Sequence, residues 1–291
     1  MMSEEKKINS VLEEMASNGK DPAGNDYRYL TLDQTKQIAG EHSITRREVE
    51  LAALRQGIIP ERYQRSIGTL GFKGQSKLLQ STVGVVGAGG LGGFVLELLT
   101  RMGIGKLIVV DGDSFADSNL NRQLLAGEKD LGCSKAETAA SRIAAVNSAT
   151  EVEAYHLIGD ADNLPNLFKG CDLVIDCLDN LPSRFVLEKV CGQLGLILIH
   201  GAIAGFLGQI AVIRPDKPLL EAIYGPISES GITRGVEVQL GNPAATPAML
   251  ASWQASEAVK ILGGLEGVLA ANILLIVDMQ SAESYQVEVT A

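Results

Sequence analysis

The sequence predicts an α/β fold: a mostly parallel sheet with helices on both of its faces, preceded by a helical N-terminal extension. Short apolar runs alternate with helix-like segments from about residue 81 onward, which is typical of strands joined by crossover helices. Hydrophobic residues make up 46% of the 291 residues, enough to build a core and too many for wholesale disorder. The 32 glycines supply positions where the backbone turns tightly or is approached closely.

The first predicted unit is the extension over residues 1–60. Residues 1–30 are polar and are expected to form a frayed arm, whereas a helix is expected to begin at Thr31, which can cap it. A second helix is expected over Ser43–Leu54. The pair has the outline of a helix-turn-helix, but we favour a small helical extension packed on the main domain because the chain is acidic.

The second predicted unit, over residues 61–291, is a Rossmann-like domain of alternating strands and helices. Its uncharged stretch 194–213 is long enough to span a membrane, but the glycines within it favour two buried strands joined by a turn. Strands are expected over residues 81–86, 106–111, 171–177, 196–199, 209–213 and 273–277, and helices over residues 94–102, 135–146, 183–194 and 248–262.

Charge and composition argue against several classes of protein. Lys and Arg number 25 against 35 Asp and Glu, a net charge of −10, whereas a general nucleic-acid binder needs a basic surface. Aromatic residues, at 4%, are too few for base-stacking platforms. The first 25 residues lack the apolar core of a signal peptide, so we expect a cytoplasmic protein without nucleic-acid or membrane partners. The four cysteines form no C-x-x-C pair and are expected to be reduced, mostly buried thiols.

A glycine-rich loop carries the first functional signal. Gly87, Gly89 and Gly92 form a G-x-G-x-x-G pattern, with Gly90 inside it, between a predicted strand and a predicted helix. Such glycines let the backbone approach a phosphate, which the free N–H groups of the following helix then bind. Asp111 ends the next strand, where an acidic group suits a ribose hydroxyl. The pattern predicts an adenine nucleotide and does not separate ATP from NAD.

Three charged residues beyond the loop favour a triphosphate. Arg122 can bind two phosphate oxygens, and Lys135, at the head of a helix, can act as a point charge on a third. Asp179 follows the strand over residues 171–177. A carboxylate at that end of a parallel strand faces the ligand crevice, and Mg²⁺ prefers one or two carboxylates together with substrate phosphates.

Together these motifs resemble a known family. Their order and spacing are similar to those of the ThiF/MoeB/HesA adenylyltransferases, which activate ubiquitin-like sulfur carriers in thiamine and molybdopterin biosynthesis. These adenylyltransferases are relatives of the ubiquitin-activating enzymes. The resemblance covers about residues 61–291. The motifs that carry it are Arg62–Arg65, Gly87–Gly92, Val110–Asp113, Ser118–Gln123, Ser134–Lys135 and Asp176–Asn180.

The resemblance implies adenylation of a small protein with Mg-ATP. The C-terminal carboxylate of a carrier ending in Gly-Gly would attack the α-phosphate, giving a carrier acyl-adenylate and pyrophosphate. Asp179 would hold the Mg²⁺, and Arg65 would reach the γ-phosphate of a neighbouring subunit, which implies a homodimer. The remaining expected roles are ribose binding by Asp111 with Asp113 nearby, phosphate contacts by Asn119, Arg122 and Gln123, and charge stabilisation at the α-phosphate by Lys135.

The sequence also departs from the family pattern. Relatives with zinc carry two C-x-x-C pairs in the C-terminal part, but Leu219–Tyr224 occupies the first of these regions, so zinc is not expected. Thr233–Val238, which corresponds to a crossover loop, contains no cysteine, so we expect the reaction to stop at the adenylate. Cys133 is expected to be incidental because nothing nearby supplies a base. We expect His200 to be a satisfied core or loop residue, since adenylation needs no base.

Two other functions remain open from the sequence. An NAD(P)-dependent oxidoreductase would use the same glycine loop and Asp111, but it leaves Arg122, Lys135 and Asp179 without a role. A non-catalytic adaptor that binds a nucleotide or a carrier would have no need of so complete a set of polar residues. The sequence names neither the carrier nor the role of the N-terminal extension.

Overall fold

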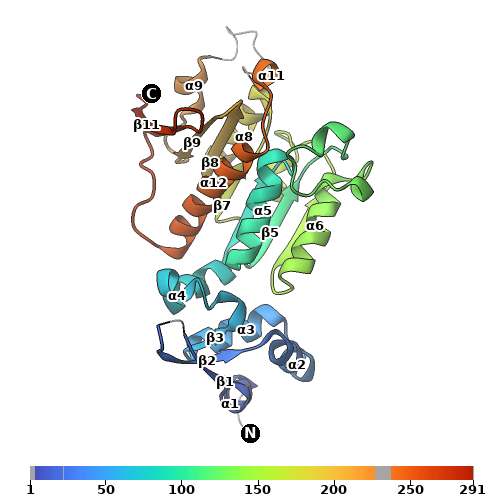
Figure 1. Cartoon of the computed structure of the whole chain (residues 1–291), viewed down its shortest axis with the longest axis vertical. Coiled ribbons are helices and arrows are strands. Elements are labelled where there is room, and N and C mark those ends of the chain that lie inside the picture. The colour runs from blue at the N-terminus through green and yellow to red at the C-terminus, as the bar shows by residue number, and fades with distance from the viewer. Residues whose placement is uncertain (1–3, 22, 227–236, 291) are drawn as a thin grey trace.

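A single eight-stranded sheet forms the centre of the protein (Figure 1). The structure is a computed structural model that describes residues 4–21, 23–226 and 237–290. The strand order is β11-β10-β9-β8-β7-β4-β5-β6. The strands are β4 (Thr82–Val86), β5 (Lys106–Val110), β6 (Glu151–Tyr155), β7 (Leu173–Asp176), β8 (Ile197–Ala204), β9 (Leu207–Ile213), β10 (Ile273–Asp278) and β11 (Glu283–Glu288).

The sheet is parallel on one side and antiparallel on the other. Strands β6, β5, β4, β7 and β8 are parallel to one another, and beyond β8 each of β9, β10 and β11 pairs antiparallel with the strand before it. The mostly parallel sheet predicted from the sequence is therefore confirmed. The stretch 194–213 forms β8 and β9 joined at Gly205, as predicted. Within the described residues, no helix is long and apolar enough to cross a membrane.

Helices cover both faces of the sheet, and each face has its own hydrophobic core. Alternating strand residues divide between the two cores: Val85 and Val109 point to one, and Val86 and Val110 to the other. The first face is covered by α5 (Gly90–Met102), α6 (Lys135–Val146) and α12 (Ala245–Gly263), which lie side by side in Figure 1. The second face is covered by α7 (Leu164–Leu167), α8 (Leu181–Leu194) and α9 (Leu220–Tyr224).

The connectivity places a crevice at the carboxyl ends of β4 and β7. From β4 the chain proceeds to β5 and β6 on one side, and later returns to β7 and β8 on the other. Ligands of open α/β sheets bind where the strand order reverses in this way, because the loops after the two central strands diverge there. Three short helices complete the main chain path: η2 (Asp117–Asn119), η3 (Glu128–Asp130) and α11 (Glu237–Leu240).

The N-terminal extension is more ordered than predicted. The expected frayed arm is wrong for the described residues, because Leu12 and Leu30 are fully buried in a separate small core. The polar composition conceals apolar residues at helical spacing, which bury one face of the first helix. The elements are α1 (Glu4–Met15), β1 (Ser17–Lys20), β2 (Asp26–Leu30), α2 (Leu32–His42), α3 (Arg46–Arg55) and β3 (Ile58–Pro60), with the three strands in one small sheet.

Capping residues set the ends of the two predicted helices. Thr31 caps α2 as predicted, through a reciprocal capping box with Gln34. The second helix begins later than expected because Ser43, at φ +53°, ends α2 and Thr45 caps α3 with Glu48. The extension is thus not purely helical, since its helices pack together with a three-stranded sheet.

A buried polar network joins the extension to the main sheet. Tyr63, in η1 (Glu61–Tyr63), donates a hydrogen bond of 3.0 Å to Glu50 and accepts one of 3.0 Å from Asn147. Arg62 hydrogen-bonds Asn147 and lies 3.3 Å from the Glu50 carboxylate. Burial raises the pKa of Glu50. Helix α4 (Ile67–Gln80) follows and leads into β4. The network therefore fixes where the chain enters the main domain.

Candidate active site

A cavity of about 710 Å³ occupies the crevice at the carboxyl ends of the parallel strands. Its walls come from the loops after β4, β5 and β7, the β8–β9 hairpin, and α9. Nine of the twelve residues predicted for the site line it: Gly87, Gly89, Gly90, Asp111, Asp113, Arg122, Gln123, Lys135 and Asp179. The three that do not are Arg65, Gly92 and Asn119.

The glycine loop is shaped by two close approaches. Gly87 has φ +94°, and a Cβ there would lie 2.5 Å from the Cys177 carbonyl oxygen. A Cβ on Gly92 would lie 2.7 Å from the carbonyl carbon of Gly87 and nearer still to its oxygen. Gly92 therefore lets α5 pack against the loop and does not itself face the ligand. The first turn of α5 has no side-chain cap, so its N–H groups and dipole favour an anion in the cavity.

Asp111 braces the glycine loop from the neighbouring strand. One carboxylate oxygen accepts a hydrogen bond of 2.6 Å from the Ala88 N–H, and the other accepts one of 2.8 Å from the Asp113 N–H. Burial raises the pKa of Asp111. The side chain still lines the cavity, so it both fixes the loop and presents a carboxylate to the ligand space.

Lys135 is a buried cation with a defined partner. Its Nζ lies 2.9 Å from Asp113 Oδ2, and only 6% of the residue is exposed. Its backbone N–H also donates to the Asp113 carbonyl at 3.0 Å. Helix α6 begins at Lys135, as predicted, and Ser134 caps it. The pair holds the ammonium group at the cavity wall, where its rotamers are already restricted.

Arg122 and Gln123 lie near the start of α5. Arg122 is half-buried, and its Nη1 donates to the Ser118 carbonyl at 2.9 Å. Gln123 is buried beside Gly89, with its Nε2 3.5 Å from where a Cβ would stand on that glycine. Its Oε1 is a buried acceptor with no hydrogen-bond partner among the described residues. Both residues thus present polar atoms next to the phosphate-sized space of the loop.

Asn119 has a structural position outside the cavity lining. Its Oδ1 accepts a hydrogen bond of 3.1 Å from the Ala116 N–H and closes η2. Its own backbone carbonyl accepts from Arg122 and Gln123 at 3.2 and 3.0 Å. Asn119 therefore shapes the loop that carries these two residues, and its contact with phosphates stays a prediction.

Asp179 is an exposed carboxylate just beyond β7. The next residue, Asn180, caps α8 by accepting from the Ser183 N–H at 3.0 Å, which fixes the turn. In the described parts of the chain, no group of three or more His, Cys, Asp and Glu side chains could hold a metal by itself. A single carboxylate at the mouth of a phosphate-sized cavity fits Mg²⁺, which takes its other ligands from phosphates and water.

Arg65 lies away from the cavity of its own chain. It is exposed and sits between η1 and α4. The adjoining Arg62 and Tyr63 bond to Asn147, just past the last residue of α6, whereas the cavity residue Lys135 is the first residue of that helix. A twelve-residue helix separates the two ends by roughly 18 Å. The tertiary structure thus separates Arg65 from the other predicted site residues.

One functional group was missed by the sequence reasoning. Asp176, His200 and Tyr224 form a buried hydrogen-bonded chain, with 2.7 Å from Asp176 Oδ2 to His200 Nδ1 and 2.9 Å from His200 Nε2 to the Tyr224 hydroxyl. Both ring nitrogens of His200 are satisfied, which confirms the expected satisfied histidine. Tyr224, with Arg184 and Gln209, lines the cavity. The only sequence signal for this group of three is an acid and a histidine at the ends of adjacent predicted strands.

The cysteines are all free thiols. Cys171, Cys177 and Cys191 are buried, and burial raises the pKa of the Cys171 and Cys191 thiols to about 12. Cys133 is exposed but does not line the cavity. The expectation about the crossover loop concerned residues 233–238, and its first four residues lie outside the described ones.

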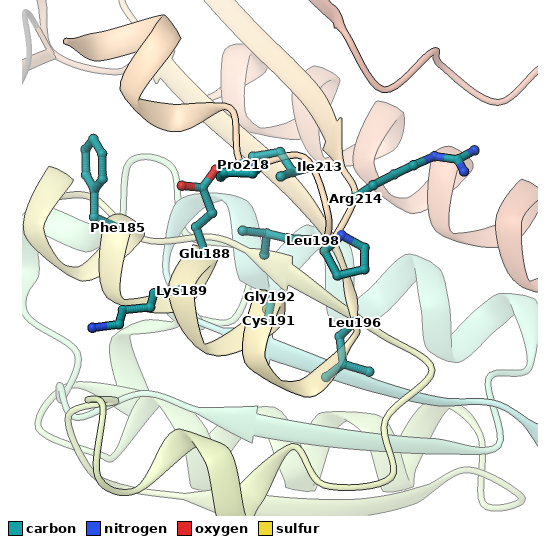
Figure 2. A pocket seen from close by; sticks show the side chains of 11 residues that line it. Phe185, Glu188, Lys189, Cys191, Gly192, Leu196, Leu198, Ile213, Arg214 and Pro218 are labelled. Carbon is teal, nitrogen blue, oxygen red and sulfur yellow. The ribbon is translucent and has the colours of Figure 1, made fainter. Parts of the chain in front are cut away.

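A second cavity, of about 400 Å³, lies on the other face, between α8 and the segment after β9. Figure 2 shows Lys189 and Arg214 pointing away from each other on opposite sides of this mostly apolar space. The Glu188 carboxylate accepts hydrogen bonds of 2.7 and 2.9 Å from the N–H groups of Leu219 and Leu220. None of the predicted site residues lines it, so the first cavity is the candidate active site.

Comparisons with known proteins show the family of the chain. The sequence matches the model of the ThiF family over residues 63–290. The SAMP-activating enzyme E1 of Haloferax volcanii is 38% identical over 204 residues, which are 69% of this chain and 75% of that protein. The sulfur carrier protein adenylyltransferase of Thermus thermophilus is 36% identical over 224 residues, 74% of this chain and 82% of that protein.

Solved structures share the fold. The crystal structure of E. coli MccB with ATP has a TM-score of 0.68 at 22% identity and covers 78% of this chain and 71% of that one. The crystal structure of PaaA has a TM-score of 0.67 at 23% identity and covers 79% of this chain and 82% of that one. Identities this low show the fold alone. Because the family model spans most of the sequence and the curated relatives exceed 30% identity over more than two thirds of it, the chain belongs to the ThiF family.

Proposed function

We propose that this protein is an ATP-dependent adenylyltransferase that activates the C-terminal carboxylate of a ubiquitin-like sulfur carrier protein ending in Gly-Gly. The observation that carries the proposal is the single cavity in which a glycine loop, two cations and a strand-end carboxylate meet. The names of the two curated relatives, a SAMP-activating enzyme E1 and a sulfur carrier protein adenylyltransferase, support it.

The reaction is a nucleotidyl transfer. A carboxylate oxygen of the carrier forms a bond to the α-phosphorus of ATP, the bond from that phosphorus to the bridging oxygen breaks, and pyrophosphate leaves. The products are a carrier acyl-adenylate and pyrophosphate. A carboxylate is already a competent nucleophile, so the protein needs to supply orientation and charge stabilisation.

The adenosine and phosphates would occupy the part of the cavity formed by the glycine loop and β5. Asp111 would accept from a ribose hydroxyl while it braces the loop. The start of α5 and the Arg122 guanidinium would bind phosphate oxygens, with the Gln123 amide beside them. Lys135, held at 2.9 Å from Asp113, would present its ammonium group to the charge that develops on the α-phosphate. Buried and preoriented donors of this kind are effective because they need little reorganisation.

Asp179 would hold Mg²⁺ together with phosphate oxygens, and the ion would supply positive charge beside the departing pyrophosphate. The side chain is exposed at the cavity mouth. Both oxygens of the Asp176 carboxylate, three residues earlier, accept internal hydrogen bonds. Zinc is not part of the proposal, because the sequence lacks C-x-x-C pairs.

A homodimer completes the proposed site. Arg65 lies far from the cavity of its own chain, so a contact with the γ-phosphate requires that it reach a neighbouring copy. With no cysteine after Cys191 in the sequence, we propose that the chain makes the adenylate and no thioester with the carrier.

Pyrophosphate–ATP exchange tests the function directly. Each small Gly-Gly-ending protein encoded in the same genome is incubated with the enzyme, Mg²⁺, ATP and labelled pyrophosphate. Exchange is expected with a cognate carrier and is expected to vanish when its last two glycines are removed. Tight NADH binding with no exchange would favour the oxidoreductase, and ATP binding with no exchange for any carrier would favour an adaptor.

A further inference from the structure

We infer that Tyr224, held by His200 and Asp176, is a positioning residue for the carboxylate-bearing tail of the protein substrate, and that it acts by fixing the Gln209 amide. The inference rests on the proposed function and names the residues that would receive the tail. It concerns the end of the cavity away from the glycine loop, which the sequence motifs leave unassigned.

The cavity, of about 710 Å³, extends from the glycine loop to the β8–β9 hairpin. Its far end is formed by the β8–β9 hairpin and α9, with Ala202, Ala204 and Gly208 among the lining residues. Small side chains along a hairpin leave space for an extended chain beside the sheet. Since the phosphates are expected at the glycine loop, a carboxylate that attacks the α-phosphate has to approach from this far end.

The proton positions in the buried chain follow from its geometry. Asp176 is fully buried, and the neighbouring Arg184 together with the His200 hydrogen bond lowers its pKa although burial acts in the opposite direction. Burial lowers the pKa of His200. Asp176 is therefore ionised and His200 neutral, so Nδ1 carries the proton that the 2.7 Å bond to Asp176 requires. Nε2 is then an acceptor, and Tyr224 donates its only proton to it.

This arrangement decides which way the Gln209 amide points. The Tyr224 hydroxyl donates its proton to His200, so its oxygen can only accept hydrogen bonds from its other neighbours. Gln209 Nε2 and Arg184 Nη1, the latter at 3.3 Å, both donate to it. With its nitrogen committed to Tyr224, Gln209 has its carbonyl oxygen for other partners. A main-chain N–H of an extended Gly-Gly tail is a donor of the required kind.

A stable mimic of the acyl-adenylate tests this without the natural carrier. The probe is 5′-O-sulfamoyladenosine acylated with N-acetyl-glycylglycine, compared with unacylated 5′-O-sulfamoyladenosine and with ATP by calorimetry. For Tyr224→Phe, the Kd of the acylated probe is expected to rise about tenfold, the effect of losing one oriented hydrogen bond. The Kd values of ATP and of the unacylated probe are expected to stay within about twofold.

A double-mutant cycle separates positioning from general damage. Gln209→Ala is expected to raise the Kd of the acylated probe as much as Tyr224→Phe does. The double variant is expected to bind this probe no more weakly than either single variant. Tyr155→Phe is the matched control, because its hydroxyl donates to Glu153 outside the cavity. It is expected to bind all three ligands as the wild type does.

The possible results are distinct. Unchanged affinity of Tyr224→Phe for the acylated probe, additive effects in the cycle, or a parallel loss of ATP affinity would overturn the inference. Wild-type protein that binds the acylated probe no more tightly than the unacylated one would also overturn it. Failure of the wild type to bind ATP or either probe would instead overturn the proposed function.

Discussion

Gly92 is the most stringent test of how the phosphate loop is built. In Gly92→Ala, the new Cβ would lie 2.7 Å from the Gly87 carbonyl carbon and nearer to its oxygen. Real Cβ atoms essentially never come within 3.0 Å of such a neighbour. The obstacle is backbone, so it cannot move aside as a side chain would. Overpacking of this kind costs about 3 kcal/mol, and the gain in helix propensity offsets about 1 kcal/mol of that. The net expectation is a loss of about 2 kcal/mol in unfolding free energy.

The neighbouring Gly93→Ala is the matched control. Its Cβ would meet the Leu125 side chain at 3.3 Å, where a small shift relieves the contact, so its stability is expected to stay within about 1 kcal/mol of the wild type. Urea unfolding measures both variants, and titration with ATP measures the loop. Because Gly92→Ala has to displace Gly87, its Kd for ATP is expected to rise at least about tenfold. Wild-type stability and ATP affinity in Gly92→Ala would refute the reasoning.

The other predictions concern charge. Asp179→Asn is expected to lose Mg²⁺-dependent pyrophosphate exchange while its unfolding free energy stays within about 0.5 kcal/mol, because the side chain is exposed; undiminished exchange would remove its metal role. Lys135→Met is expected to slow exchange about a hundredfold, and a change only in KM would contradict a role at the developing charge. A mixture of Arg65→Ala and Asp179→Ala subunits is expected to regain exchange if Arg65 acts across a dimer, and heterodimers without activity would refute this. Burial lowers the pKa of His200 from 6.5, so as the pH falls this residue is protonated in the unfolded chain before it is protonated in the folded one. The unfolding free energy is therefore expected to decrease as the pH falls below 6.5, by at most about 1.4 kcal/mol per pH unit. His200→Gln should lack this component in urea titrations, and an unchanged pH slope would exclude His200 as its source.

Local sequence signals predicted the glycine-loop end of the cavity. The strand, glycine loop, helix, strand and acid follow one another within residues 82–111, so chain connectivity alone brings Asp111 to the loop. The helix over Lys135–Val146 is predicted by its alanine-rich content and is observed with those ends, with Ser134 as its cap. Short-range geometry of this kind depends little on the rest of the fold.

Long-range packing decided what the sequence did not show. The three-stranded sheet of the extension depends on β2 pairing with β3, about thirty residues later. Its burial of Leu12 and Leu30 against Val49 is invisible in a polar segment. The placement of Asn119 outside the cavity lining likewise depends on a turn that redirects its side chain.

The sequence by itself determined the fold class and the residues that meet at the glycine-loop end of the cavity, because each motif is short and the direction of a strand fixes the edge of the sheet at which it ends. Only the tertiary structure decided which residues meet at the far end of the cavity. Asp176, His200 and Tyr224 come from β7, β8 and α9, and they meet only because parallel pairing sets Asp176 opposite His200 while α9 folds back over the sheet. It also placed Arg65 at the other end of α6 from Lys135, since the buried contacts of Arg62 and Tyr63 with Asn147 hold that segment there.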